Sequence, residues 1–136
     1  MDLEQQLATV PLLAGLEPKV RRRLAEIGKR RTYLPGETIV KEGTTGTALY
    51  IVLSGKARVE RDEKAIAELG TGDFFGELAL IEEHPRSATV VASEETDCLL
   101  FVAWEFTALL EEHPEIAVPI MRELIQRTHR REHHGA

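Results

Sequence analysis

Turn-forming residues divide the middle of the sequence into short runs that favour β-strands. The runs are rich in Val, Leu and Ile, and most of the breaks contain Gly, Pro or Ser, which tight turns prefer. We expect strands at Thr38–Val40, Leu49–Leu53, Lys56–Glu60, Ala65–Leu69, Thr89–Ala92 and Cys98–Val102. The turn signals around them are Pro35-Gly36, Gly43, Gly46, Ser54-Gly55 and Gly70-Thr71-Gly72. Turns at such regular spacing predict a small antiparallel barrel or roll.

Segments with helical periodicity lie on both sides of this β-rich region. The helices that we expect are Leu3–Ala8, Glu17–Arg31, Glu105–Glu112 and Glu115–Arg131. Pro119 falls near the start of the last of these, where a proline lacks the amide hydrogen for an intrahelical bond. Either that helix kinks at Pro119, or it begins near Val118 with Pro119 in its first turn. Both readings place a break between residues 114 and 120.

The length of 136 residues suits one domain. We predict a single domain over residues 1–136, with helices in 1–31, a β-roll in 32–103, helices in 104–131 and a tail at 132–136. The predicted fold class is therefore α+β. It is an antiparallel β-roll, jelly-roll-like and of the double-stranded β-helix type, with N-terminal helices and two C-terminal helices.

No apolar run approaches the length of about 18 residues that a transmembrane helix needs. The first residues, MDLEQQLATVPLLAGLEPK, carry acids where a signal peptide has its positive region, and Pro11 and Gly15 interrupt the apolar part. We therefore expect a cytoplasmic protein that does not enter a membrane. Cys98 is the single cysteine, so no intrachain disulfide can form, and its apolar neighbours indicate a buried strand position.

The formal net charge of −6 argues against broad affinity for nucleic acids. There are two local exceptions to this acidic balance. Arg21–Arg23 with Lys29–Arg31 makes the predicted early helix basic, and Arg127, Arg130 and Arg131 make the last helix basic. A solvated helix face with cations near its C-terminal end explains both clusters as well as a partner does.

One stretch, FFGELALIEEHPRSATV, places an acid and a base among residues that otherwise suit a core. A short helix is expected from about Glu77 to just before His84-Pro85, and unpaired amides at a helix start bind anions or hydroxyls. Arg86 offers a planar fork suited to two phosphate oxygens, whereas Glu77 accepts a hydrogen bond from a hydroxyl. A ligand carrying both groups satisfies the pair. An Arg86–Glu77 ion pair that closes a loop is the alternative.

Within this stretch, FGELALIEEHPRSATV resembles the phosphate-binding cassette of the cyclic nucleotide-binding domain. That domain is shared by regulatory subunits of cAMP-dependent protein kinase, cyclic nucleotide-gated channels and the catabolite activator family. LPGETIVKEG and LYIVLSGKARV resemble its first roll strands, and GLEPKVRRRLAEIGKRR resembles its N-terminal helical segment. The resemblance covers roughly residues 12–131, with the cassette at 74–90.

The resemblance implies a role for each matching residue. Glu77 should accept from the ribose 2′-hydroxyl, near the amides of Gly76 and Leu78. Arg86 should pair with the cyclic phosphate, helped by Ser87. The apolar side of the pocket should be lined by residues that plain core packing would also explain, namely Val59, Ile66 and Leu69.

The resemblance also implies that the two C-terminal helices form a hinge and a lid. The lid candidates on the last helix are Leu124, Arg127, Thr128 and Arg131. Arg127 matches an arginine that faces the cassette acid in the catabolite activator family, so a contact with Glu77 is expected. A solvated Arg127 is the alternative.

A cyclic nucleotide sensor is the function that the resemblance implies, with cAMP or cGMP as ligand and neither cofactor nor metal. The pattern PRSATV favours cAMP. Binding should move the last helix and so signal to an unknown effector protein or to the other subunit of a homodimer formed through that helix. Because the sequence ends at Ala136 without a helix-turn-helix segment, we expect no direct binding to DNA.

Two other classes of function compete with this prediction. The last helix is apolar over a wide arc, which suits a protein-interaction module that keeps the fold with ligand optional; the residues are Ile116, Val118, Ile120, Met121, Leu124 and Ile125. A metal-dependent enzyme on a similar roll would need histidines on strands. The histidines are expected in the cassette turn (His84), before a helix (His113) and at the C-terminal end (His129, His133 and His134). We therefore predict that the chain is not an enzyme.

Overall fold

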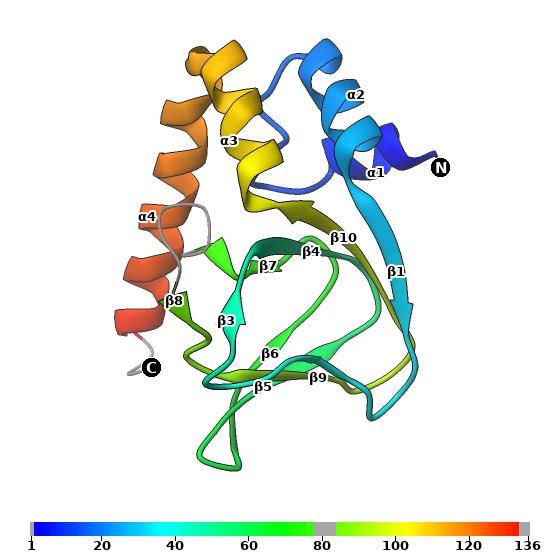
Figure 1. The fold of residues 1–136 in the computed structure, drawn as a ribbon, viewed down its shortest axis with the longest axis vertical. Helices are drawn as coiled ribbons and strands as arrows, with labels where there is room; N and C mark the ends of the chain where they lie inside the picture. The colour runs from blue at the N-terminus through cyan, green and yellow to red at the C-terminus, as the bar shows by residue number, and fades with distance from the viewer. Residues whose placement is uncertain (1, 78–83, 134–136) are drawn as a thin grey trace. The chain divides into compact units, whose positions relative to one another are not determined.

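The structure is a computed structural model that describes residues 2–77 and 84–133, without the side chains of residues 84 and 127–133. The chain divides into two compact units. The β-roll unit is residues 28–106, and the helical unit combines residues 1–27 with residues 107–136 (Figure 1). In the described ranges, no helix is both long enough and apolar enough to cross a bilayer.

The β-roll unit consists of antiparallel strands, as the spacing of turn signals predicts. Its strands are β1 (Lys29–Tyr33), β2 (Thr38–Val40), β3 (Thr45–Gly46), β4 (Ala48–Ser54), β5 (Ala57–Arg61), β6 (Lys64–Leu69), β7 (Phe74–Phe75), β8 (His84–Pro85), β9 (Thr89–Ala92) and β10 (Thr96–Val102). In the described residues they form two four-stranded sheets, ordered β1-β10-β4-β7 and β2-β9-β5-β6, and a two-stranded sheet of β3 and β8. The predicted fold class, α+β with an antiparallel β-roll and helices at both ends, is confirmed.

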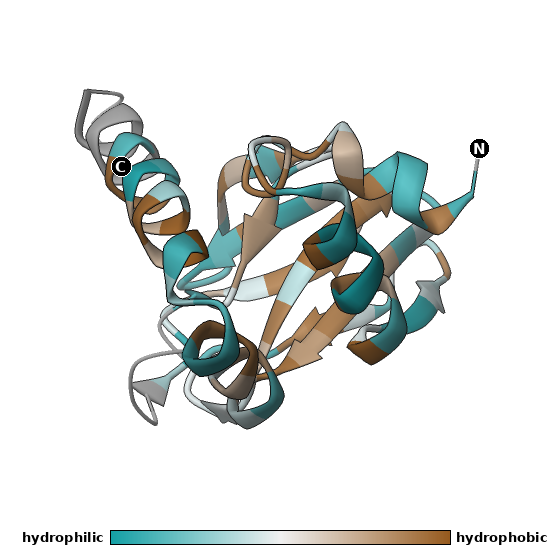
Figure 2. Ribbon diagram, turned by 90° about the horizontal axis from the view of Figure 1, so that it is seen from above, coloured by the Kyte–Doolittle hydropathy of each residue, from teal (hydrophilic) through white to brown (hydrophobic). Residues whose placement is uncertain are grey.

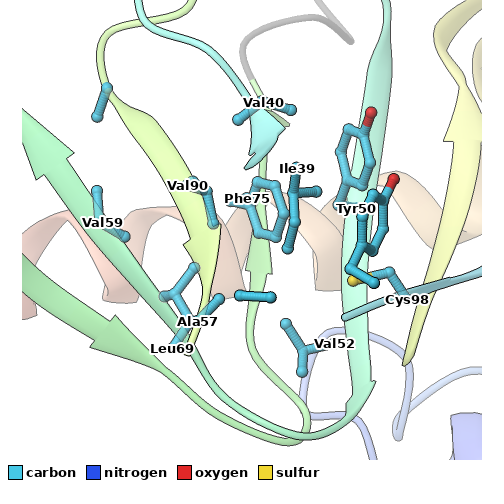
Figure 3. Close-up of a cluster of buried hydrophobic side chains, with 13 residues drawn as sticks. Ile39, Val40, Tyr50, Val52, Ala57, Val59, Leu69, Phe75, Val90 and Cys98 are labelled. Carbon is cyan, nitrogen blue, oxygen red and sulfur yellow. The ribbon is translucent and has the colours of Figure 1, made fainter. Parts of the chain in front are cut away.

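The core of the roll lies between its two larger sheets, and both contribute side chains to it (Figure 3). The labelled residues of this cluster are Ile39, Val40, Tyr50, Val52, Ala57, Val59, Leu69, Phe75, Val90 and Cys98. Full burial of an aliphatic or aromatic side chain contributes about 1.5–3 kcal/mol. Cys98 lies in this cluster with no exposed surface, which confirms its predicted place on a buried strand.

The hairpin of β5 and β6 has two local irregularities. Its turn residues Asp62 and Glu63 have φ values of 52° and 65°, the left-handed conformation that a two-residue hairpin turn requires. The pairing register also shifts between Val59 and Glu60, which face Ala67 and Ala65, so Ile66 is the extra residue of a bulge. Ile66 is 40% exposed, and the other residues of β6 before Leu69 are exposed too, because β6 is the edge strand of its sheet.

The predicted helix over Glu17–Arg31 is too long, because its last residues form strand β1. Helix α2 is Pro18–Ile27, and Gly28 follows it. A Cβ at Gly28 would lie 2.8 Å from the Cγ of Leu99, so only glycine permits this close approach to β10. Beyond Gly28 the chain pairs with β10, and the Arg30 guanidinium binds Asp97 with an Nη2–Oδ2 distance of 2.5 Å. Long-range pairing therefore overrides the helical propensity of the basic segment.

Short strands were missed elsewhere too. Strands β3, β7 and β8 have two residues each, too few to show an alternating pattern in the sequence. His84 was expected in a turn, but it belongs to β8, where it pairs with Gly46. The helix expected from Glu77 lies mostly outside the described residues, although Glu77 itself has 3₁₀ backbone geometry.

Helices of the helical unit begin at recognisable signals. In α1 (Leu3–Ala8), the Asp2 carboxylate accepts from the Gln5 amide at 2.9 Å, and the Gln5 side chain accepts from the Asp2 amide at 2.9 Å. This reciprocal pair is a capping box. Helix α2 begins at Pro18, a position where the missing amide hydrogen costs nothing.

The break predicted between residues 114 and 120 is present. Helix α3 (Ala103–Glu112) starts in the β-roll unit and ends before His113, whose φ of −130° and ψ of 69° are not helical, as expected for a residue that precedes proline. A 3₁₀ turn η2 (Pro114–Ile116) then leads into α4 (Ala117–His133). Pro119 lies in the first turn of α4, so the reading with a late helix start is correct. The predicted tail at 132–136 begins too early, since α4 continues to His133.

Candidate functional site

Backbone hydrogen bonds hold Arg86 on both sides. Its amide donates to the Thr44 carbonyl at 2.7 Å, and its carbonyl accepts from the Gly43 amide at 2.9 Å. Just before it, β8 pairs with β3, which places Pro85 opposite Thr45. The segment that leads into β4 therefore fixes the backbone of Arg86.

The Arg86 guanidinium is half-buried inside the roll unit. Its Nη2 donates to the Ala48 carbonyl at 3.0 Å, and its Cζ lies 5.7 Å from the centroid of the Tyr50 ring. The Tyr50 ring in turn is stacked on Phe75, with 4.9 Å between centroids and 5° between planes. A cation at this distance over an aromatic face is attracted by the ring quadrupole. The Arg86 guanidinium therefore lies over one ring of a stacked aromatic pair.

Two glycines border the guanidinium. A Cβ at Gly76 would lie 2.5 Å from Nη1 of Arg86 and 2.7 Å from the Ala48 carbonyl oxygen, and Gly76 has a φ of +84°. A Cβ at Gly46 would overlap the guanidinium itself. The charged group therefore lies directly against backbone at two points where any side chain would exclude it.

The electrostatics of Arg86 reflect both its burial and its neighbours. Burial lowers the pKa of Arg86 from its ordinary 12.5, while negative charge on Tyr50 or on Glu77 raises it. The guanidinium remains a cation at neutral pH, because arginine does not lose its proton in proteins. Glu77, the other predicted site residue, therefore acts electrostatically on Arg86.

A second network fixes the segment that follows Arg86. The Nε of Arg61 donates to the Ser87 carbonyl at 3.0 Å, and the Glu42 amide donates to the Thr89 hydroxyl at 2.9 Å. Glu42 also accepts from the Asp62 amide at 3.3 Å. The sequence carries no signal for these contacts, because they join residues far apart along the chain.

The remaining predicted residues fall into separate groups. Val59 and Leu69 are buried in the core cluster, so plain packing accounts for them, whereas Ile66 is too exposed to be a core residue. Leu78 lies outside the described residues, and so do the side chains of three lid candidates, Arg127, Thr128 and Arg131. Leu124 is half-buried on α4. A pocket wall and a lid made by these residues remain predictions.

Metal binding and thiol chemistry receive no support from the described part of the chain. No three His, Cys, Asp or Glu side chains come together there in a way that could hold a metal ion. Burial, with a smaller contribution from Asp97, raises the pKa of the Cys98 thiol to about 12. A thiol with so high a pKa is a poor nucleophile at neutral pH.

A half-buried cation, an acid that acts on it electrostatically and a close glycine backbone together form, on a β-roll, an arrangement suited to an anionic ligand. The family described as "Cyclic nucleotide-binding domain" matches residues 30–113. This chain belongs to that family.

Two curated relatives and one solved structure illustrate the range of the family. The chain is 38% identical over 112 residues to the cyclic AMP receptor protein of Thermus thermophilus, a match that covers 79% of this chain and 52% of that protein. It is 51% identical over 95 residues to a cGMP-dependent protein kinase of Toxoplasma gondii, covering 70% of this chain and 10% of the kinase. The crystal structure of the Thermus thermophilus catabolite activator protein has a TM-score of 0.80 at 35% identity, over 90% of this chain and 60% of that one.

The chain thus spans about half the length of the first of these curated relatives and a tenth of the second.

Proposed function

We propose that this chain binds a cyclic nucleotide at Arg86 and Glu77 and that binding changes the position of helix α4. The observation that carries the proposal is the placement of the Arg86 guanidinium, which donates to the Ala48 carbonyl, lies over the Tyr50 ring and fills space that two glycines leave free. A planar cation oriented by such contacts suits a cyclic phosphate, because its two parallel N–H groups can donate to two phosphate oxygens. Glu77 then accepts from the ribose 2′-hydroxyl.

The other predicted residues complete the proposed site. The amides of Gly76, Leu78 and Ser87 would donate to the sugar and the phosphate. Val59, Ile66 and Leu69 would contact the apolar side of the nucleotide; the partial exposure of Ile66 supports this, since an apolar side chain that is not packed in the core is available to a ligand. Leu124, Arg127, Thr128 and Arg131 would close over the base. The two units would then work as one regulatory domain.

We propose cAMP rather than cGMP as the natural ligand. The name of the Thermus thermophilus relative refers to cyclic AMP, and its match covers the larger part of this chain. The Toxoplasma gondii kinase is named for cGMP and has the higher identity over a shorter match. Ser87 is compatible with both ligands. The PRSATV pattern is what favours cAMP.

We propose that helix α4 transmits the effect of ligand binding to a partner. Three exposed apolar residues follow one face of this helix: Val118 (54% exposed), Met121 (52%) and Ile125 (59%). Together with Arg122 and Gln126 they line a groove of mostly apolar surface, and Figure 2 shows the alternation of apolar and polar segments along α4. An apolar stripe of this kind is typical of a protein contact. We propose that it meets a second copy of the chain or an effector protein.

The same stripe favours a second candidate function, a protein-interaction module in which the ligand is optional. Sedimentation at increasing protein concentration, with and without cAMP, separates the two. A sensor whose α4 moves should change its association state when nucleotide is added, whereas a constitutive module should associate equally in both conditions.

Calorimetric titration of the chain with cAMP and with cGMP tests the leading proposal. We expect saturable binding of both, tighter for cAMP. The absence of heat from either nucleotide at high micromolar concentration would exclude it.

We do not propose an enzyme, a cofactor or direct binding to DNA. The cytoplasmic location remains a prediction.

A further inference from the structure

We propose that Gly46 is a positioning residue of the phosphate site, because the missing side chain at this position leaves the space that the Arg86 guanidinium occupies. The inference rests on the proposed function. It adds a residue that the sequence indicates only as a turn signal and that lies on a different strand from the cassette.

Strand pairing brings Gly46 to this place. Gly46 is buried in β3 and pairs with His84 of β8, two residues before Arg86. A Cβ at Gly46 would overlap the Nε, Cζ and Nη2 atoms of Arg86, and these are its nearest neighbours. The guanidinium therefore occupies the space that a Cβ of residue 46 would need.

The conflict at Gly46 would move Arg86 rather than the backbone. Gly46 does not have a left-handed conformation, so alanine can adopt its backbone geometry without strain. The atoms that a new methyl group meets are the far end of a flexible side chain. Gly76 differs in both respects, since its φ is +84° and its Cβ would also meet the backbone oxygen of Ala48. Gly46 thus allows the site to be altered with the fold intact, and Gly76 does not.

A displaced guanidinium cannot keep its present contacts. The Nη2 bond to the Ala48 carbonyl is 3.0 Å long, and the Tyr50 ring lies on one side of the group. A shift away from Gly46 changes the direction of the planar fork, and two-point binding of a phosphate depends on that direction. Gly46 therefore controls phosphate affinity through Arg86, without touching the ligand itself.

Gly46→Ala tests this inference, with Gly70→Ala as the matched control. Gly70 is in the same unit, has no left-handed φ, and a Cβ there would meet nothing within 4 Å. We expect Gly46→Ala to weaken cyclic nucleotide binding by about tenfold or more, the loss typical of one charge-assisted contact, and to leave the urea midpoint nearly unchanged. Gly70→Ala should alter neither quantity. Equal affinity of Gly46→Ala and the wild type would overturn the inference.

A mutant cycle with Arg86→Lys shows whether the effect passes through Arg86. We expect the double variant Gly46→Ala/Arg86→Lys to bind no more weakly than the weaker single variant, because both changes remove the same oriented guanidinium. Fully additive losses would mean that Gly46 acts independently of Arg86 and would overturn the inference. If Gly46→Ala does not fold, Gly46→Ala/Arg86→Ala should fold, because the overlap is gone; failure of this variant too would contradict the steric account.

A measurement without ligand separates this inference from the proposed function. The Nε–H resonance of Arg86, assigned by its loss in Arg86→Lys, should shift in Gly46→Ala as the group leaves the Tyr50 ring, and should stay in place in Gly70→Ala. An unchanged resonance in Gly46→Ala overturns the positioning role, whether or not nucleotide binds. A wild-type chain that binds neither nucleotide overturns the proposed function alone, and the Nε–H shift then still decides the steric claim.

Discussion

The Arg86 guanidinium lies 5.7 Å above the ring of Tyr50, and that ring is itself stacked on Phe75. This stack connects the core of the roll to the Arg86 guanidinium of the cassette. The site is therefore supported by residues that also stabilise the fold, and each part of that support can be tested separately.

Replacing Tyr50 should weaken nucleotide binding only when the new side chain lacks an aromatic ring. Tyr50→Leu removes the aromatic face and should weaken nucleotide binding by about threefold to thirtyfold, the range expected for a partly desolvated cation–π contact. Tyr50→Phe keeps the face and should bind nearly as well as the wild type. Calorimetric titration of both variants checks this. Equal losses in the two variants would assign the effect to the hydroxyl group instead of the ring.

The bond from Arg61 to the Ser87 carbonyl should also contribute to affinity. Arg61→Gln removes a charged donor from the segment that follows Arg86, and we expect a loss of about twofold to tenfold. Lys64→Gln is the matched control, since Lys64 pairs with Arg61 across the hairpin, is exposed, and loses the same charge. A general electrostatic effect would weaken both variants alike, which affinity measurements at low and high salt would show.

Gly55 should be essential for stability rather than for binding. It has a φ of +96°, and a Cβ there would lie 2.7 Å from the Cα of Thr96. Thr96 is fully buried, and its hydroxyl lies 2.9 Å from the carbonyl oxygens of Lys56 and Glu94, so it cannot easily move. We expect Gly55→Ala to lower the free energy of unfolding by at least about 1–3 kcal/mol. Urea denaturation measures the loss, and Gly70→Ala should show almost none.

Alkaline pH should destabilise the protein partly through Cys98. Its pKa is raised from 9.0 to about 12 in the folded state, so the folded chain holds this proton more tightly than the unfolded chain. The stabilisation is complete below pH 9 and is lost as the pH rises from there toward 12, with a slope approaching about 1.4 kcal/mol per pH unit.

Urea denaturation of the wild type and of Cys98→Ala, at pH values of about 8 and ~10.5, isolates this effect. Burial also raises the pKa of Tyr33, which adds a loss of the same sign to both proteins. The wild type should therefore lose more stability than Cys98→Ala. Parallel losses would show that Cys98 does not carry the effect.

The sequence predicts most of the fold because its turns are marked by glycine and proline. The strands Thr38–Val40 and Thr89–Ala92 match the prediction at both ends, and the break before Pro119 follows from the chemistry of proline. The prediction fails at Lys29–Arg31, where the chain forms a strand only because β10 is present to pair with it. Local propensity contains no information about a partner that lies so far along the chain.

The site is predictable to a smaller extent. Glu77 and Arg86 are found from an acid and a base in one apolar stretch, and in the structure the acid influences the pKa of the base. Arg61 and Gly46 could not be found in this way. Arg61 acts on a backbone carbonyl, which no sequence pattern marks, and Gly46 acts through the absence of a side chain. Only the folded roll shows what occupies that space.

The central claim is that Arg86 binds the phosphate of a cyclic nucleotide, and calorimetric titration of Arg86→Gln tests it most directly. Arg58→Gln is the control, because Arg58 is an arginine of the same unit whose Nε lies 2.5 Å from Glu60 on its own strand. We predict that the wild type and Arg58→Gln bind cAMP with similar affinity and that Arg86→Gln binds at least about tenfold more weakly. Equal affinity of Arg86→Gln and the wild type would contradict the account.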